Sequence, residues 1–142
     1  LQSYGVAADV WSVTSYKELY TDAVETDRWN RLHPDEEPRR SYLQECFEGH
    51  EGVFVAASDY VKALPGAIAK WVPGRMVPLG TDGFGRSDGR TALRDYFEVD
   101  SRFITLAALS GLAEEGKIKA DKVKKAIADL DIDTEKIGPL QV

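Results

Sequence analysis

The densest set of chemically useful groups lies in residues 80–90, Gly-Thr-Asp-Gly-Phe-Gly-Arg-Ser-Asp-Gly-Arg. This stretch holds four glycines, two aspartates and two arginines, and it lies between an apolar run at 75–79 and a helical pattern. Glycine-rich loops bring backbone N–H groups close to phosphates, and aspartate and arginine side chains form charge-assisted hydrogen bonds. The stretch is therefore a phosphate cradle, a catalytic loop or a tight connection between a strand and a helix.

The glycine spacing argues against dinucleotide binding. Gly83, Gly85 and Gly89 form G-x-G-x-x-x-G, which is one residue longer than the dinucleotide motif G-x-G-x-x-G. Bulky Phe84 would obstruct the approach of a pyrophosphate, and the two aspartates of the loop would repel it. We expect a structural or interface loop instead. Its candidate interface residues are Asp82, Gly83, Phe84, Gly85, Arg86, Ser87 and Asp88.

The remaining reactive side chains are isolated from one another in the sequence. Cys46 lies on an apolar helix face and is expected to fill space there, while His33 is expected to be structural and His50 to face solvent. One cysteine and two histidines are too few for the usual closed zinc site. The acidic run at 35–37 is typical of a solvated connection, and no nucleophile elbow G-x-S-x-G occurs. The sequence therefore predicts no catalytic and no metal-binding residue.

The elements that position the loop alternate between strands and helices. Apolar runs at 6–13, 53–57 and 75–80 predict strands, and helical spacing of apolar residues follows each of them. The expected helix starts are Ser15 (in a capping box with Glu18), Ser41, Ser58, Asp100 and Asp121. This order predicts an α/β fold, a three-layer α/β/α sandwich with a mainly parallel sheet and right-handed crossovers.

Three details qualify this architecture. Residues 1–4 resemble the last turn of a helix that ends at Gly5, so we expect the sheet to lack an element at its front. Pro65 and Gly66 should split the helical pattern that runs from Tyr60 to Trp71. Residues 131–142 are polar, and we expect them to be loosely held.

Composition limits the classes of function. With 142 residues the chain is expected to form one domain, 1–142, and no apolar run approaches the roughly 20 residues that span a bilayer. The net charge of −6 disfavours nucleic-acid binding. The one basic doublet expected to have a non-acidic neighbour, Arg39–Arg40 after Pro38, comes behind the acidic run 35–37. A lone cysteine favours a reducing cytoplasm over an oxidising compartment. We expect neither a nucleic-acid nor a membrane partner.

Four stretches resemble one known family. They are AADVWSVTSY (7–16), RWNRLHP (28–34), ASDYVKALP (57–65) and LGTDGFGRSDGRTALRDYFEVD (79–100). They are similar to the C-terminal, transketolase-type domain of homodimeric bacterial pyruvate dehydrogenases, the thiamine-diphosphate-dependent decarboxylating component of the pyruvate dehydrogenase complex. The resemblance runs from about Tyr4 to about Pro139.

The resemblance implies a part of a much longer multidomain enzyme, without the first strand and helix of the domain. Such an enzyme decarboxylates pyruvate and acetylates the lipoyl group of the dihydrolipoyl acetyltransferase, its partner in the complex. It works as a homodimer in the bacterial cytoplasm, with thiamine diphosphate and magnesium held by its first two domains. The diphosphate-binding motif of the family is absent from this chain, so no bound cofactor is expected here and the chain alone should be inactive.

The role of the 80–90 loop is then expected to be mechanical. Loops at the carboxyl ends of parallel strands face clefts and neighbouring domains. The loop should hold this domain against the rest of the polypeptide or against the second copy of the enzyme. Two alternatives remain open: a free-standing flavodoxin-like module that binds a phosphate or nucleotide through this loop, and the same domain of another transketolase-type enzyme.

Overall fold

The computed structural model describes residues 1–141 of the chain. Within them, the sheet has two parallel strands, β1 (Val53–Ala57) and β2 (Arg75–Leu79), in a register that pairs Val53 with Arg75 and Ala57 with Leu79. The helices are α1 (Tyr16–Leu32), α2 (Tyr42–Cys46), α3 (Ala63–Gly66), α4 (Arg90–Tyr96), α5 (Ser101–Glu114) and α6 (Ala120–Asp129), and 3-10 turns form η1 (Gln2–Tyr4), η2 (Ala69–Trp71) and η3 (Pro139–Gln141).

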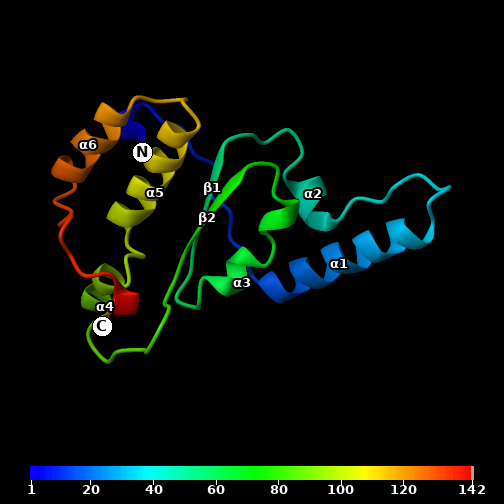
Figure 1. Cartoon of the computed structure of the whole chain (residues 1–142), viewed down its shortest axis with the longest axis horizontal. Helices are drawn as coiled ribbons and strands as arrows, with labels where there is room; N and C mark the ends of the chain where they lie inside the picture. The colour runs from blue at the N-terminus through cyan, green and yellow to red at the C-terminus, as the bar shows by residue number, and fades with distance from the viewer. Residues whose placement is uncertain (142) are drawn as a thin grey trace.

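The elements form three layers, as Figure 1 shows. Helix α5 packs on both strands, and α6 packs on α5. On the other side of the sheet, α3 contacts β2, and α1 contacts both α2 and α3. The predicted α/β class and the three-layer arrangement are therefore confirmed, with two strands in the described sheet instead of the three that were expected.

The helix starts follow local chemistry. The Ser15 hydroxyl accepts the Glu18 N–H at 3.2 Å and begins α1, so the predicted helix start is confirmed, with only the serine half of the expected capping box. At α2 the box is complete, because Ser41 Oγ accepts the Gln44 N–H and Gln44 Oε1 accepts the Ser41 N–H at 2.9 Å. Both caps satisfy N–H groups that a helix start leaves without an intrahelical partner.

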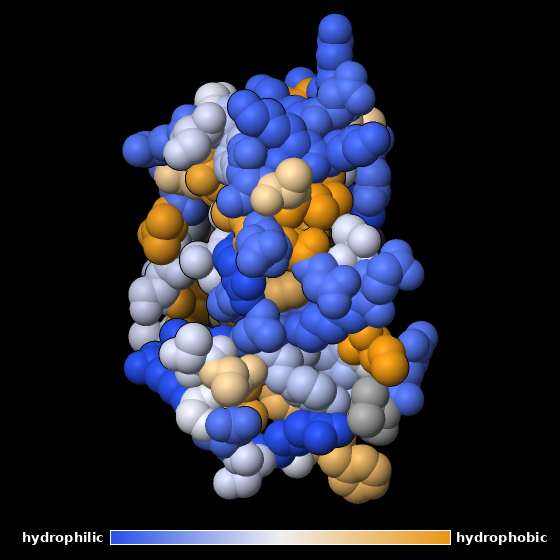
Figure 2. All heavy atoms as spheres, turned by 90° about the vertical axis from the view of Figure 1, so that its left-hand side faces the viewer, coloured by the Kyte–Doolittle hydropathy of each residue, from blue (hydrophilic) through white to orange (hydrophobic). Residues whose placement is uncertain are grey.

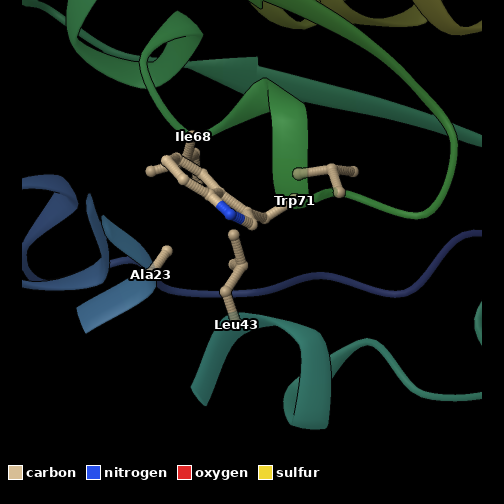
Figure 3. Close-up of a cluster of buried hydrophobic side chains, with 5 residues drawn as sticks. Ala23, Leu43, Ile68 and Trp71 are labelled. Carbon is tan, nitrogen blue, oxygen red and sulfur yellow. The ribbon is translucent and has the colours of Figure 1, made fainter. Parts of the chain in front are cut away.

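The core on the α1 side is built around an indole ring. Ala23 of α1, Leu43 of α2, Ile68 and Trp71 point toward one another in Figure 3 and are buried together with Val72. Trp71 Nε1 donates to Asp27 Oδ2 of α1 at 3.1 Å, so the one polar atom of the indole ring has a hydrogen-bond partner. The hydrophobic residues of α1, α2 and the crossover between the strands thus form one contiguous core.

The opposite core lies between the sheet and α5. Leu109 of α5 is fully buried, and Phe103 and Ala108 of the same helix and Ala126 of α6, which packs on α5, are buried as well. At Gly111, a Cβ would lie 2.7 Å from a methyl carbon of Val53, which is closer than real contacts allow. Glycine at this position therefore lets α5 approach β1 closely.

Helix α5 begins at Asp100, as expected. Asp100 Oδ1 accepts the Arg102 N–H at 2.9 Å and the Phe103 N–H at 3.2 Å, and the Arg102 side chain bonds its Oδ2. Burial of this carboxylate raises its pKa, but the hydrogen bonds from the Arg102 side chain and from the two backbone amides outweigh burial. The pKa of Asp100 is therefore lowered from its ordinary value of 3.8.

Replacing Asp100 with asparagine should lower the free energy of unfolding at pH 7 by about 1 kcal/mol, because the charge-assisted part of the cap is lost. A carboxylate with a lowered folded-state pKa stabilises the fold above its ordinary pKa, and this stability is lost as pH falls through the folded value. The difference between the wild type and D100N should thus shrink below about pH 4. Urea unfolding at pH 7 and pH 3 measures it.

Asp121→Asn is the matched control for that cap. Asp121 lies in the first turn of α6, but Lys119 is the N-cap of this helix and its side chain makes no capping bond. The prediction that Asp121 caps the helix is therefore wrong, because the helix starts one residue before it. D121N should change stability by less than about 0.5 kcal/mol. An equal loss in both variants would contradict the assigned role of Asp100.

The predicted strand at 6–13 is wrong. Residues in this segment belong to no strand, and the side chain of Val10 is 95% exposed. Trp11 packs its ring edge-on against Phe47 at 5.3 Å, but no backbone ladder joins the segment to β1. An apolar run becomes a strand only when it forms a ladder of backbone hydrogen bonds with another strand, and within residues 1–141 this run forms none.

Two further expectations concern breaks in the chain. The split at Pro65 is confirmed, since α3 ends at Gly66 and η2 begins at Ala69. The segment 131–141 is less loosely held than expected. Lys136 Nζ donates to the backbone oxygen of Asp95, and η3 follows close to the 80–90 loop.

Candidate functional site

The 80–90 loop begins at the carboxyl end of β2 and is fastened to the connection that follows β1. Thr81 N–H donates to Tyr60 O at 2.8 Å. Asp82 Oδ1 accepts the Lys62 N–H at 2.9 Å, and Lys62 Nζ lies 3.8 Å from Asp82 Oδ2. Asp82, expected to bond across a domain boundary, therefore bonds within this domain and holds two adjacent loops together.

The middle of the loop turns at Gly83 and points a large apolar side chain outward. Gly83 has a φ of 77°, a left-handed conformation that favours glycine. Phe84, which follows it, is 92% exposed. A bulky aromatic ring presented to solvent at the tip of a turn is the strongest feature of the loop that the domain itself does not use.

The charged residues of the loop find partners nearby. The Arg86 guanidinium carbon lies 4.5 Å from the centre of the Tyr96 ring in α4, a cation–π contact. Asp88 Oδ1 accepts the N–H of Gly89 at 2.6 Å. Ser87 is exposed. The structure thus brings the loop together with α4, and of the expected interface residues Phe84 projects most clearly away from the domain.

This geometry does not make a phosphate cradle. A phosphate at the start of α4 would need the N–H of Gly89 as a hydrogen-bond donor. This N–H already donates to the Asp88 carboxylate. A Cβ at Gly85 or at Gly89 would meet nothing within 4 Å, so neither glycine serves a close approach inside the chain. The carboxylates of Asp82 and Asp88 would also repel an anion at the loop.

Two shallow hollows flank the loop at the same edge of the sheet. One, of about 260 Å³, lies between the start of α1 and the end of β1 and is lined by Val13, Ser15, Tyr16, Ser58, Tyr60 and Leu64 among others. The other, of about 270 Å³, is lined by Lys62, Gly80, Asp82, Glu98 and residues 138–141. Burial raises the pKa of the Tyr16 phenol from its ordinary value of 10, so this group offers no base at neutral pH. Neither hollow pairs a nucleophile with a base.

The isolated reactive residues lie apart from the loop. His33 Nδ1 lies 2.9 Å from Trp29 O and its ring stacks on the Trp29 indole, a structural role as expected. His50 packs edge-on against Trp11 and lies 3.5 Å from Asp9 Oδ2, and Cys46 is half-buried. Within residues 1–141 no group of three or more His, Cys, Asp or Glu residues is placed to hold a metal ion.

Sequence reasoning missed two features of this surface. Ile137 and Leu140 are exposed beside the loop, although the polar segment that carries them was expected to be loosely held. The signal that could have indicated this contact is the presence of two large apolar residues within 136–141. On α6, the basic doublet Lys124–Lys125 also has non-acidic neighbours, so Arg39–Arg40 is not the one doublet of this kind. Arg39 itself lies with its guanidinium carbon 3.5 Å from the centre of the Trp29 ring.

Comparison with known proteins places the chain in context. The family model of the transketolase-like TK C-terminal domain matches residues 1–100. The chain is 49% identical over 138 residues to a pyruvate dehydrogenase E1 component of Pseudomonas aeruginosa, covering 96% of this chain and 16% of that protein. It is 44% identical over 139 residues to the one from Escherichia coli, covering 97% and 15%, and 42% identical over 130 residues to the one from Mycolicibacterium smegmatis, covering 92% and 14%.

The chain spans about one sixth of the length of these relatives. None of the helices among residues 1–141 combines the length and the apolar character needed to cross a membrane.

Proposed function

Because the chain belongs to the transketolase-like C-terminal domain family, we propose that residues 1–142 are the C-terminal domain of a pyruvate dehydrogenase E1 component. The whole polypeptide decarboxylates pyruvate with thiamine diphosphate and magnesium and transfers the acetyl group to the lipoyl group of a dihydrolipoyl acetyltransferase. It acts as a homodimer in the bacterial cytoplasm. The observation that carries the proposal is 49% identity over 96% of the chain to a protein of that name.

The residues of this domain do not fit the cofactor. A metal-bound diphosphate requires a cluster of oxygen ligands, and residues 1–141 contain no acidic cluster placed to hold a metal ion. The chain has one asparagine, Asn30, and both ends of its amide are used by the Arg39 backbone, at 2.9 Å and 2.8 Å. The proposal therefore assigns cofactor binding and chemistry to other parts of the polypeptide.

The role of this domain is structural. Its three layers form a body with two cores, and the 80–90 loop presents Phe84 at the carboxyl edge of the sheet. Asp82, Arg86 and Asp88 shape the loop through contacts inside the domain, which leaves the aromatic ring as the contact with a neighbour. The loop is an interface loop, held in shape before its partner arrives.

The test is calorimetric titration of the chain with thiamine diphosphate plus magnesium, and then with NAD and FMN. We expect no heat of binding from the isolated chain, because residues 1–141 hold no cluster placed to bind a metal ion and the loop carboxylates repel a phosphate. The full-length polypeptide should bind thiamine diphosphate and decarboxylate pyruvate, and it is the positive control.

Two results would contradict the proposal. Micromolar binding of NAD or FMN by the isolated chain would favour a nucleotide-binding module instead. A full-length polypeptide that binds thiamine diphosphate but leaves pyruvate unchanged would favour a transketolase-type enzyme with another substrate.

A further inference from the structure

Exposed apolar side chains from three separate segments gather at the carboxyl edge of the sheet. Single exposed apolar residues are common on protein surfaces, but a contiguous group marks an interaction site. The members come from the connection after β1, from the 80–90 loop and from the C-terminal segment 136–141, and their exposed fractions lie between 51% and 92%. We call this group the carboxyl-edge face; it consists of Tyr60, Val61, Phe84, Ile137 and Leu140.

Hydrogen bonds and packing make the three segments one surface. Thr81 N–H donates to Tyr60 O, which joins the first two segments. A Cβ at Gly83 would lie 3.7 Å from Leu140 Cδ2 and 3.7 Å from Pro139 O, which places the third segment against the loop. In Figure 2, hydrophobic side chains appear at the lower end of the molecule, at the height where Figure 1 places the loop and the C-terminal segment.

The C-terminal segment is anchored on both sides of its apolar residues. Lys136 Nζ donates to Asp95 O and lies 3.9 Å from Asp95 Oδ2, at the end of α4. Gln141 N–H donates to Gly138 O at 2.9 Å, which closes the turn that carries Leu140. The segment therefore presents Ile137 and Leu140 in a fixed place, although neither side chain is buried by the domain.

We propose that the carboxyl-edge face is the surface on which the preceding part of the same polypeptide docks, and that the segment 136–141 belongs to this contact. The inference rests on the proposed function and names the partner of the 80–90 loop. Docking also explains why positions 85 and 89 hold glycine, although a Cβ at either position would meet nothing within 4 Å inside the chain. Glycine at such positions lets a second surface come close to the loop backbone.

The choice of occupant follows from chain length and charge. The relatives are about six times as long as this chain, and the matching family is a C-terminal domain, so most of the polypeptide precedes it. Ligands and neighbouring domains of open α/β sheets meet the carboxyl ends of the strands, which is where this face lies. A second copy of the chain is the weaker candidate, because each copy carries a net charge of −6.

Hydrogen exchange measured by mass spectrometry tests the docking directly. Amides of 83–88 and 137–141 should exchange about tenfold or more slowly in the full-length polypeptide than in the isolated chain. The control segment is 31–36, at the far end of α1, where the two rates should agree. Equal rates at the carboxyl-edge face in both proteins would overturn the proposal.

A double variant separates docking from folding. Phe84→Ser with Leu140→Ser should return the full-length exchange rates to those of the isolated chain and lower the unfolding midpoint of the full-length polypeptide alone. The matched control is Leu32→Ser, an exposed leucine outside the face, which should change neither. Loss of stability in the isolated chain carrying the double variant would overturn the proposal, because the side chains would then serve the domain itself.

Three other outcomes are informative. Sedimentation of the isolated chain as a dimer that the double variant abolishes would assign the face to a second copy and overturn the proposal. If the full-length polypeptide protects the face but has no activity on pyruvate, docking is supported while the proposed function fails. Activity on pyruvate without protection of the face overturns docking alone.

Discussion

Replacing Gly80 with alanine should lower the free energy of unfolding by about 3 kcal/mol and the unfolding midpoint by about 10 °C. The Cβ would lie 2.3 Å from Tyr60 O and 3.1 Å from Lys62 N. Both atoms belong to the backbone, so neither can rotate away as a side chain would. Relief requires the two loops to separate, and this breaks the bonds from Thr81 to Tyr60 and from Lys62 to Asp82.

Thermal and urea unfolding of the isolated chain measure this effect. Gly85→Ala is the control from the same loop, because a Cβ there would meet nothing within 4 Å. It should change stability by less than about 0.5 kcal/mol. If both variants are neutral, the close approach of the two loops at Gly80 is not a feature of the folded protein.

Leu109→Ala should cost about 3 to 4 kcal/mol, the second large effect. Leu109 has no exposed surface and lies on α5, the helix that covers both strands. Truncation removes the transfer free energy of the side chain and leaves a cavity that the close-packed surroundings fill only in part. The denaturation midpoint in urea should fall while the slope with urea concentration stays constant, since the surface exposed on unfolding hardly changes.

The matched control for that truncation is Leu32→Ala. Leu32 ends α1 and is 58% exposed, so the same chemical change should cost less than about 1 kcal/mol. Similar losses in the two variants would mean that Leu109 is not buried in the folded protein as described.

The elements that the sequence predicted well are those with local signals. Ser15 and Asp100 begin their helices through bonds to amides two or three residues away, and β1 and β2 are apolar runs bounded by turns. The run at 6–13 carries the same signal as β1, yet it forms no strand. Whether a run pairs depends on a partner far away in the sequence, which local patterns cannot reveal.

The place of the 80–90 loop in the fold was predicted, but the orientation of its side chains was not. The 80–90 loop lies at the carboxyl edge of the sheet, as the order of elements implied. However, Asp82 bonds inward to Lys62 while Phe84 faces outward, and residue types alone would suggest the reverse. The contribution of 136–141 depends on a return of the chain across some 50 residues to Gly83, and only the three-dimensional structure reveals it.

The cover that α5 provides has a consequence for the order of folding. Two strands alone are at most marginally stable in water, and a pair becomes stable when a helix packs on it. Here that helix lies well after both strands in the chain, and its Gly111 meets Val53 at the start of β1. The sheet therefore becomes stable only after residues 101–114 have been synthesised. In a nascent chain that ends before them, one face of the strands stays exposed to chaperones and proteases.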